Sequence, residues 1–176
     1  MIRRFVPLLF LLAGCAHTSK LPVYGVVPDF ELTAQDGRPF RSAAELKGAV
    51  WVADFIFTNC PGVCPRMTSQ MRQVQQGAPQ VQLVSFTIDP ERDTPGVLAA
   101  YAKAHSANTD RWHFLTGAVP ALNHLARDVF MLGNVDSTLT HSTRFVLVDR
   151  QSRIRGFYDT SEPESISRLI AALRSL

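Results

Sequence analysis

The sequence predicts an α/β fold in which a central mixed β-sheet is flanked by helices. Residues 49–57 (AVWVADFIF) form a near-continuous apolar run, as expected for a central strand that is covered on both faces. A helix at 67–74 and a second strand at 81–88 follow, which makes a strand–helix–strand unit with parallel strands. Strands at 145–148 and 154–158, joined by a short connection, add an antiparallel hairpin, so the sheet is mixed.

The remaining elements extend the sheet and cover it. An Asp36-Gly37 turn between Phe30 and Phe40 predicts an N-terminal β-hairpin, because Asp-Gly adopts the positive φ angles of a tight turn. Residues 42–46 fit a short capped helix, and Thr94-Pro95 begins a helix that runs to about residue 105. The other expected elements are a strand at 112–115, a helix at 120–130 and a closing amphipathic helix at about 162–173.

The first fifteen residues, MIRRFVPLLFLLAGC, have the layout of a secretory signal, with an apolar run too short to span a bilayer. Their ending, Leu12-Ala13-Gly14-Cys15, resembles the lipobox of bacterial lipoproteins. We therefore expect residues 1–15 to be a lipoprotein signal peptide ending at Cys15, which is lipidated. Residues 16–27 would be a polar tether, and 28–176 a single domain. The alternative is a signal sequence that is not cleaved, or is cleaved elsewhere, in which Cys15 has no role.

Composition indicates a soluble globular domain and gives no support for nucleic-acid binding. The 176 residues are 46% hydrophobic and 19% charged, which argues against extended disorder. The net charge of +3 includes Arg3 and Arg4 of the signal; without them 16 basic residues face 15 acidic ones. No basic patch interleaved with aromatic residues follows.

The segment FTNCPGVCPRM lies between the central strand and a helix, a favoured place for chemistry in an α/β sheet. Amides at the helix start favour thiolates, so Cys60 and Cys64 could form a disulfide, a redox couple or a metal site. A disulfide across so short a loop would stabilise the fold only weakly. Three residues separate the cysteines, where a thioredoxin-type dithiol has two. Gly62 permits an unusual turn, so this loop can open around an ion; two soft thiolates suit Cu(I) or Zn(II) but need a further ligand.

His141 is the histidine best placed to supply that ligand. The stretch HSTRFVLVD puts it in a loop before an apolar strand, and it would face the cysteines if that strand lies beside the central one. The residues alone leave this role open. Met67 and Met71 share the helical face of Cys64, where packing in the core explains them more simply than metal ligation.

The segment IDPERDTP follows the second parallel strand and should open at the same sheet edge as the cysteines. Asp89 could orient a ligand, bind a cation or only cap the loop. Arg92 and Asp93 could simply pair with each other. A rigid turn before a helix capped by Thr94 explains the segment equally well.

Taken together, FTNCPGVCPRM, SFTIDPERDTP and THSTRFVLVD resemble the Sco (SenC) family of copper chaperones in order and separation, from about Val27 to the C-terminus. The resemblance implies a thioredoxin-like fold. It maps a CxxxC pair, which is both a copper site and a redox disulfide, onto Cys60 and Cys64. It maps a distal histidine onto His141, and the three residues would together bind one Cu(I) or Cu(II). It also maps an acidic residue behind the ligands onto Asp89.

The resemblance implies a metallochaperone rather than an enzyme. Family members act in assembly of the dinuclear copper centre of respiratory cytochrome c oxidase, either delivering copper to subunit II or reducing its cysteines. We expect this chain to pass copper by ligand exchange to subunit II, and to have other periplasmic copper chaperones as partners. It would be a monomeric lipoprotein of the bacterial cell envelope, held at the membrane through Cys15 and facing the periplasm or the extracytoplasmic side.

Two alternatives use the same thiols. A thiol–disulfide oxidoreductase would keep the oxidase cysteines reduced and would not need His141, and a redox or copper sensor would act by interaction. A thioredoxin-type enzyme usually presents a proline where Ser142-Thr143 stands here. The family often has an acidic residue where this chain has Gly62, and many relatives use a transmembrane anchor instead of lipid.

Overall fold

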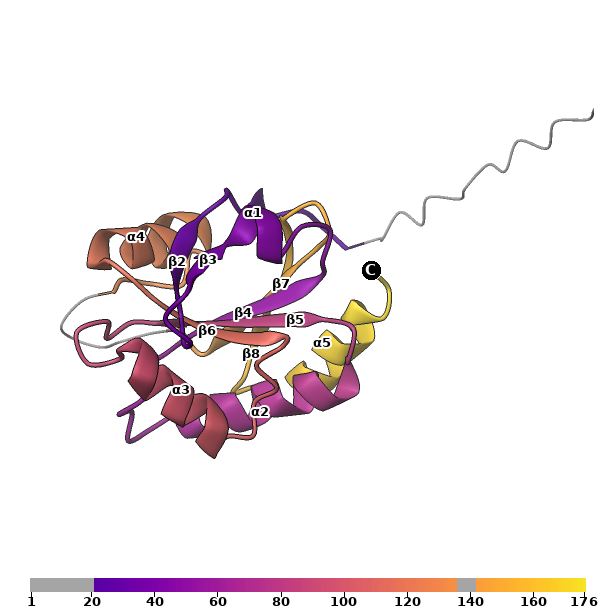
Figure 1. Ribbon diagram of the computed structural model, residues 1–176. Helices are drawn as coiled ribbons and strands as arrows, with labels where there is room; N and C mark the ends of the chain where they lie inside the picture. The colour runs from indigo at the N-terminus through magenta and orange to yellow at the C-terminus, as the bar shows by residue number, and fades with distance from the viewer. Residues whose placement is uncertain (1–20, 136–141) are drawn as a thin grey trace, which may run out of the picture.

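The computed structural model describes residues 21–135 and 142–176, which form one mixed sheet between two layers of helices (Figure 1). The strands have the order β1-β8-β7-β4-β5-β6-β2-β3. They are β1 (Gly25–Val26), β2 (Glu31–Ala34), β3 (Pro39–Arg41), β4 (Trp51–Ile56), β5 (Gln82–Thr87), β6 (Trp112–Thr116), β7 (Arg144–Val148) and β8 (Arg153–Asp159).

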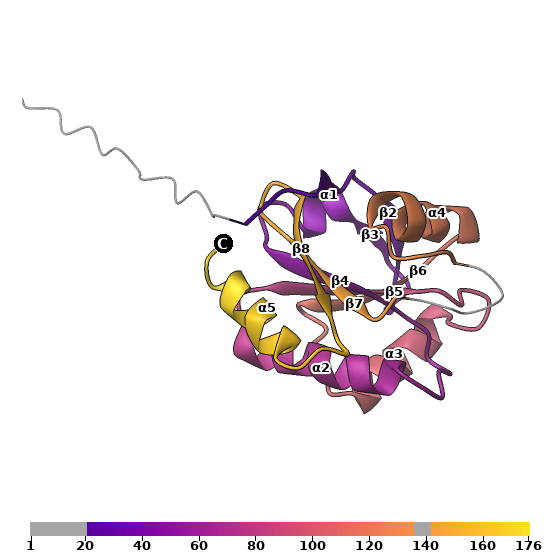
Figure 2. The ribbon, with the colours of Figure 1, turned by 180° about the vertical axis from the view of Figure 1, so that it is seen from behind.

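Helices cover both faces of the sheet. α2, α3 and α5 lie on one face, and α1 and α4 lie on the other (Figures 1 and 2). The helices are α1 (Ser42–Glu45), α2 (Cys64–Gly77), α3 (Pro95–Ala104), α4 (Val119–Asn123) with a π-helical turn at His124–Val129, and α5 (Ser165–Leu173). None of the helices in the described part of the chain has the length and apolar character needed to cross a membrane.

β4 is the centre of the core. All six of its residues are buried, because it pairs in parallel with β5 and antiparallel with β7 and carries helices on both faces. On one face, the Phe55 ring stacks on Phe86 and meets Phe130 edge-on. On the other, Met67 and Met71 of α2 are fully buried, which confirms that they pack in the core.

The structure confirms the expected elements and corrects several boundaries. α2 begins at Cys64 rather than at residue 67, because Pro65 fits the first turn of a helix. The expected helix at 120–130 is α4 followed by the π-helical turn. The closing helix begins at Ser165 rather than at 162. α1 forms as expected but has no side-chain cap.

The N-terminal β-hairpin is part of the sheet. β2 pairs with β3 around a turn in which Gly37 has a φ of 80°, the conformation for which glycine is favoured. β2 also pairs with β6, so the hairpin lengthens the sheet beyond its parallel core. At the opposite edge, β1 pairs with β8, so Gly25 and Val26, which fall within the segment 16–27 expected to be a tether, are part of the sheet.

A buried arginine fixes the start of the described chain. Arg155 on β8 is 4% exposed and donates to the Asp149 carboxylate at 2.6 Å, to the Pro22 carbonyl at 2.9 Å and to the Leu21 carbonyl. Asp149 also accepts from Arg153 at 2.8 Å. Because a guanidinium presents several donors in a fixed plane, one side chain holds the N-terminal segment against β8.

Replacing Arg155 with methionine should destabilise the fold by roughly 3 kcal/mol, since the buried Asp149 carboxylate would lose its best partner. Urea unfolding followed by circular dichroism measures this. Arg168→Met is the matched control, because Arg168 forms an exposed ion pair with Glu162 and should cost less than about 1 kcal/mol. Equal losses in the two variants would show that the Arg155 contacts do not stabilise the fold.

Candidate metal centre

The cysteine loop, the IDPERDTP segment and the described start of β7 lie at one edge of the sheet. β4, β5 and β6 are parallel, so the cysteine loop after β4 and the IDPERDTP segment after β5 open at the same edge (Figure 1). β7 runs antiparallel to β4, so its first residue, Arg144, lies towards that edge as well. The described chain resumes at Ser142, two residues before β7, and therefore enters β7 at the cysteine edge.

The two cysteines differ in environment although only three residues separate them. Cys60 is partly exposed in the loop, whereas Cys64 is the first residue of α2 and is fully buried. The Cys64 backbone N–H donates to the Cys60 sulfur at 3.5 Å. Both side chains are thiols in this structure. The helix start thus directs its amides towards one sulfur and encloses the other.

This geometry separates the acidities of the two thiols. Burial disfavours the Cys60 thiolate, but hydrogen bonds from the Cys64 thiol and from the backbone amides of Cys64, Gly62 and Val63 outweigh it and lower the pKa of Cys60. Burial raises the pKa of Cys64, and the hydrogen bond to Cys60 and the nearby Asp54 carboxyl raise it further. Cys60 is therefore the more acidic and the more exposed thiol of the pair.

Asp93 joins the cysteine loop to the loop after β5. Its carboxylate is 1% exposed and accepts from the Thr58 backbone N–H at 3.1 Å, from the Thr58 hydroxyl at 2.5 Å and from the Thr87 hydroxyl at 2.5 Å. Thr58 is two residues before Cys60. One buried carboxylate therefore fixes the start of the cysteine loop relative to the end of β5.

The interpretation that Arg92 and Asp93 pair with each other is wrong. Arg92 pairs with Asp89, at 2.9 Å, and leaves Asp93 for the two threonines. Asp89 is itself 7% exposed, and its backbone N–H donates to the Thr87 hydroxyl at 2.9 Å. Asp89 therefore lies at the cysteine edge, as expected, with Arg92 as its ionic partner. No local sequence signal distinguished the two acids, because both stand within three residues of the arginine.

A second buried carboxyl, which the sequence analysis did not identify, lies beneath the cysteines. Asp54 is fully buried on β4 and accepts from the Ser85 hydroxyl at 2.6 Å, and Ser85 in turn accepts from the Trp112 indole N–H at 3.0 Å. Within the described residues, the Asp54 Oδ2 atom has no hydrogen-bond partner. Burial raises the pKa of Asp54 to about 7. Asp54 is the one charged residue in the apolar run 49–57, and the sequence around it gave no indication of its place near the cysteines.

The described residues supply two soft ligands and no complete metal cluster. No group of three or more His, Cys, Asp or Glu side chains gathers around a common point within residues 21–135 and 142–176. His141, the expected third ligand, lies outside the described residues, as does Cys15. The donor set present, two thiols at an open sheet edge with one of them acidic, suits a soft cation such as Cu(I).

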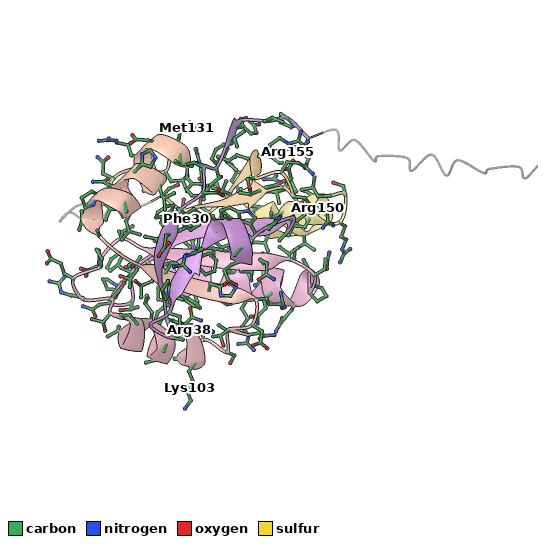
Figure 3. The ribbon with its side chains drawn as sticks, turned by 45° about the horizontal axis from the view of Figure 1, so that its top comes forward. Phe30, Arg38, Lys103, Met131, Arg150 and Arg155 are labelled. Atoms are coloured by element: carbon green, nitrogen blue, oxygen red, sulfur yellow. The ribbon has the colours of Figure 1, made fainter. Side chains whose placement is uncertain are left out.

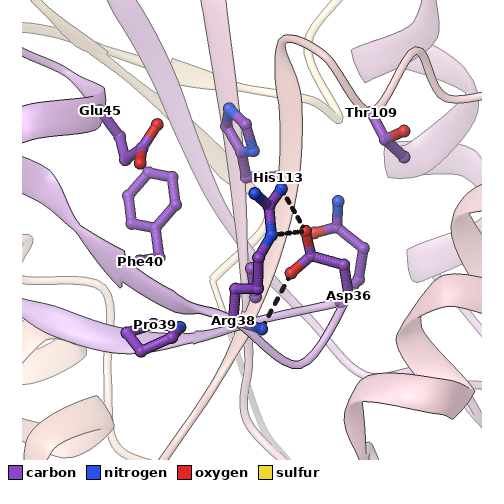
Figure 4. Close-up of a pocket in the computed structure, with 9 residues that line it drawn as sticks. Asp36, Arg38, Pro39, Phe40, Glu45, Thr109 and His113 are labelled. Carbon is purple, nitrogen blue, oxygen red and sulfur yellow. Dashed lines mark hydrogen bonds and ion pairs between the residues drawn. The ribbon is translucent and has the colours of Figure 1, made fainter.

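A pocket elsewhere on the molecule has a different character (Figure 4). It has a volume of about 230 Å³ and lies between the β2–β3 hairpin and the first residues of β6. An exposed Asp36–Arg38 ion pair of 2.6 Å lines it, and the His113 ring packs on Phe40 with ring centroids 5.0 Å apart. Burial lowers the pKa of His113, which favours the neutral imidazole. This pocket contributes nothing to the cysteine edge.

Comparison with known proteins identifies the family. The sequence model of the SCO1/SenC family matches residues 19–176. This chain belongs to the SCO1/SenC family. A relative from Stutzerimonas stutzeri, named "Putative copper-binding protein", is 34% identical over 152 residues, which are 80% of this chain and 72% of the relative.

Solved Sco structures share the fold. The crystal structure of a SCO1/SenC family lipoprotein from Bacillus anthracis has a TM-score of 0.82 and 33% identity, over 90% of this chain and 99% of that one. The structure of BsSco has a TM-score of 0.75 and 30% identity, over 89% of this chain and 95% of that one. BsSco is described with a disulfide switch, as a member of the Sco family of cytochrome c oxidase assembly proteins. The expected Sco/SenC membership and thioredoxin-like fold are thus confirmed.

Cys60 should react with iodoacetamide at neutral pH more than about tenfold faster than Cys64, since a lowered pKa and partial exposure favour its thiolate. Mass spectrometry of the cysteine-containing peptides after timed labelling measures the two rates. The unfolded chain serves as the control, in which both thiols should react alike. Comparable rates in the folded chain would contradict the assigned acidities.

Asp93→Ala should cost roughly 3 kcal/mol of unfolding free energy, because the buried Thr58 and Thr87 donors lose their acceptor. Thermal or urea unfolding measures the loss. Asp36→Ala is the control: it removes an exposed turn carboxylate, and should cost less than about 1 kcal/mol. An Asp93→Ala protein as stable as the control would show that this carboxylate does not hold the loop.

Proposed function

We propose that this chain is a copper metallochaperone that binds one copper ion through Cys60, Cys64 and His141 and passes it to subunit II of a cytochrome c oxidase. The observation that carries the proposal is the cysteine pair at the sheet edge, with one acidic, partly exposed thiol and one buried thiol. Two soft sulfurs select Cu(I) over harder cations. Family membership and the relative named as a copper-binding protein support the choice of copper.

His141 is the third ligand in this proposal. Its support is the position of β7, which begins at the cysteine edge only three residues after His141 in sequence. A neutral imidazole is a strong ligand for either copper oxidation state. Three protein ligands would leave one side of the ion open, and an incoming partner cysteine could then displace them one at a time.

The two thiols would have different roles in transfer. Cys60 is partly exposed and has the lowered pKa, so it is the sulfur from which the metal would pass between proteins. Cys64 is held in the first turn of α2, and its high pKa means that the metal must displace its proton on binding. Copper affinity should therefore rise with pH. Asp93 keeps the loop in place through Thr58, and Asp89 with Arg92 borders the site without supplying a sulfur or nitrogen donor.

The protein would act at the extracytoplasmic face of a bacterial membrane, held there by lipid on Cys15. The LAGC sequence at 12–15 and the similarity to the Bacillus anthracis family lipoprotein support this anchor. The domain itself would be a monomer whose partners are subunit II and other periplasmic copper chaperones.

Thiol–disulfide exchange is the second candidate, because an acidic exposed thiol beside a buried one is also what an exchange reaction uses. The thiolate of Cys60 would attack a partner disulfide, and Cys64 would then release the reduced partner by closing the Cys60–Cys64 bond. The disulfide switch of BsSco is consistent with a closable pair in this family. The three-residue spacing and Ser142-Thr143 in place of a proline favour the metal role.

Copper titration of the full chain in detergent should give about one ion per chain. His141→Ala and Cys60→Ala should each weaken binding by more than about 100-fold, since losing a ligand costs more than losing a group behind one. His124→Ala is the control, because His124 is an exposed residue paired with Asp128 and should leave the affinity unchanged.

Unchanged copper binding in the Cys60→Ala, His141→Ala double variant would refute the proposed site. A reductase assay on a partner disulfide in metal-free buffer separates the two candidates. The chaperone role predicts that His141→Ala abolishes copper transfer and spares any reduction. Full biological activity of His141→Ala would instead assign the function to the thiols alone.

A further inference from the structure

We infer that the end of the domain opposite the cysteine loop is a membrane-contact surface, by which an anionic lipid bilayer orients the protein with its metal edge facing away from the membrane. We call this surface the foot; it comprises residues 21–27, 47–48, 150–153 and 174–176. The inference rests on the lipid anchor at Cys15 proposed above and adds a fixed orientation to it.

The foot exposes three apolar side chains that lie close together in the sequence. Val23, Tyr24 and Val26 are 52%, 53% and 63% exposed. Val26 lies in β1, the outermost strand of the sheet, which pairs with β8, and the Tyr24 backbone N–H just before it donates to the Ile154 carbonyl at 2.9 Å. The Tyr24 ring meets Phe157 edge-on at 5.3 Å, so it is held by the fold. A valine–tyrosine–valine group of this kind fits the boundary between lipid headgroups and acyl chains, where aromatic residues with a polar end are favoured.

The foot is where the tether leaves the domain. Arg155 holds the Leu21 and Pro22 carbonyls against β8, so the exit point is fixed (Figure 3). Only five residues, 16–20, separate Cys15 from Leu21. Six residue steps reach at most roughly 20 Å, which is shorter than the domain is wide. A lipid on Cys15 would therefore keep this end near the bilayer and the other end far from it.

Basic residues lie at the same end of the domain as the apolar group. Val26 lies opposite Arg153 in the pairing of β1 with β8. Arg150 donates to the carbonyls of Gly48 and Leu176, which brings the segment with Lys47 and the C-terminal residues to the same end. Arg174 lies in that C-terminal segment.

Few negative charges oppose these cations. Asp149 is buried, and its charge is balanced by Arg155 and Arg153. The exposed acids nearest to the foot in sequence, Asp29 and Glu45, lie outside it, two residues beyond Val27 and two residues before Lys47. Lysines and arginines close to a surface are attracted to anionic lipid, so the charge favours the same contact as the apolar residues.

The metal edge lies at the far end. β4 starts at Trp51, next to the foot segment 47–48, and ends at Ile56, directly before the cysteine loop (Figures 1 and 2). When the foot rests on the bilayer, β4 points away from it and Cys60 is presented to the aqueous side. A partner whose metal site stands above the membrane surface could then reach the sulfur without the domain turning over.

Tryptophan substitutions test the orientation, because the two native tryptophans, Trp51 and Trp112, are no more than 1% exposed. The lipidated full chain carrying Val26→Trp, and a matched chain carrying Val97→Trp, are placed in vesicles of phosphatidylglycerol and phosphatidylcholine with brominated acyl chains. Val97 is 40% exposed and lies in the first turn of α3, at the metal edge. Flotation establishes that each protein is bound to the vesicles.

We expect the bromolipid to quench the added fluorescence of Val26→Trp at least twofold and to leave that of Val97→Trp unchanged. Lys47→Glu in the Val26→Trp background should reduce the quenching when phosphatidylglycerol is present. Equal quenching, or none, at the two positions in floating protein would overturn the orientation while leaving the anchor intact. Protein that does not float would overturn both.

A second copy of the chain is the other occupant that the exposed edge strand could accept. In that case the Val26→Trp emission would shift to the blue as protein density in the membrane rises, without quenching by the brominated lipid. This outcome would also overturn the proposal. A density-independent spectrum with quenching at position 26 supports the lipid contact.

Discussion

The placement of the site depends on the pairing of β4 with β5 on one side and β7 on the other. Since β4 is buried on both faces, a one-residue slip would move every side chain to the opposite face and disrupt its packing on both sides. Parallel pairing puts the ends of β4 and β5 at one edge, and antiparallel pairing brings the start of β7 to the same edge. Three segments separated by up to eighty residues therefore meet because one strand is held between two others.

The identical side chains of Cys60 and Cys64 acquire different chemistry from this arrangement. The turn that follows β4 leaves one sulfur in front of the amides of α2 and takes the other into the core between α2 and the sheet. The buried Asp54 carboxyl lies on that inner side and disfavours a second negative charge. Two local environments thus give one cysteine of the pair a lowered pKa and the other a raised pKa, and in the proposed copper site the second thiol would keep its proton until the metal binds.

The sequence was sufficient to predict the elements that carry a strong periodic or apolar pattern. The run at 49–57, the strand–helix–strand unit around the cysteines and the Asp-Gly hairpin could all be predicted, because burial on one or two faces is recorded in the order of residues. Interactions between residues that are far apart in the sequence produce no such pattern. Nothing near Pro22 indicates that Arg155 will hold it, and nothing near Thr58 points to Asp93. The ligand role of His141 and the lipidation of Cys15 stay predictions.

Asp93 and Arg155 are two buried charged groups that fix opposite ends of the domain. Asp93 fixes the cysteine loop, and Arg155 fixes the N-terminal segment. Each forms several hydrogen bonds at once. Through these bonds each connects a segment with little secondary structure to the end or the edge of a strand. In the proposed transfer role the metal would have to leave the site, so its ligands could not themselves hold the loop rigid. The rigidity has to come from a group that does not bind the metal, and the carboxylate of Asp93 is placed to supply it.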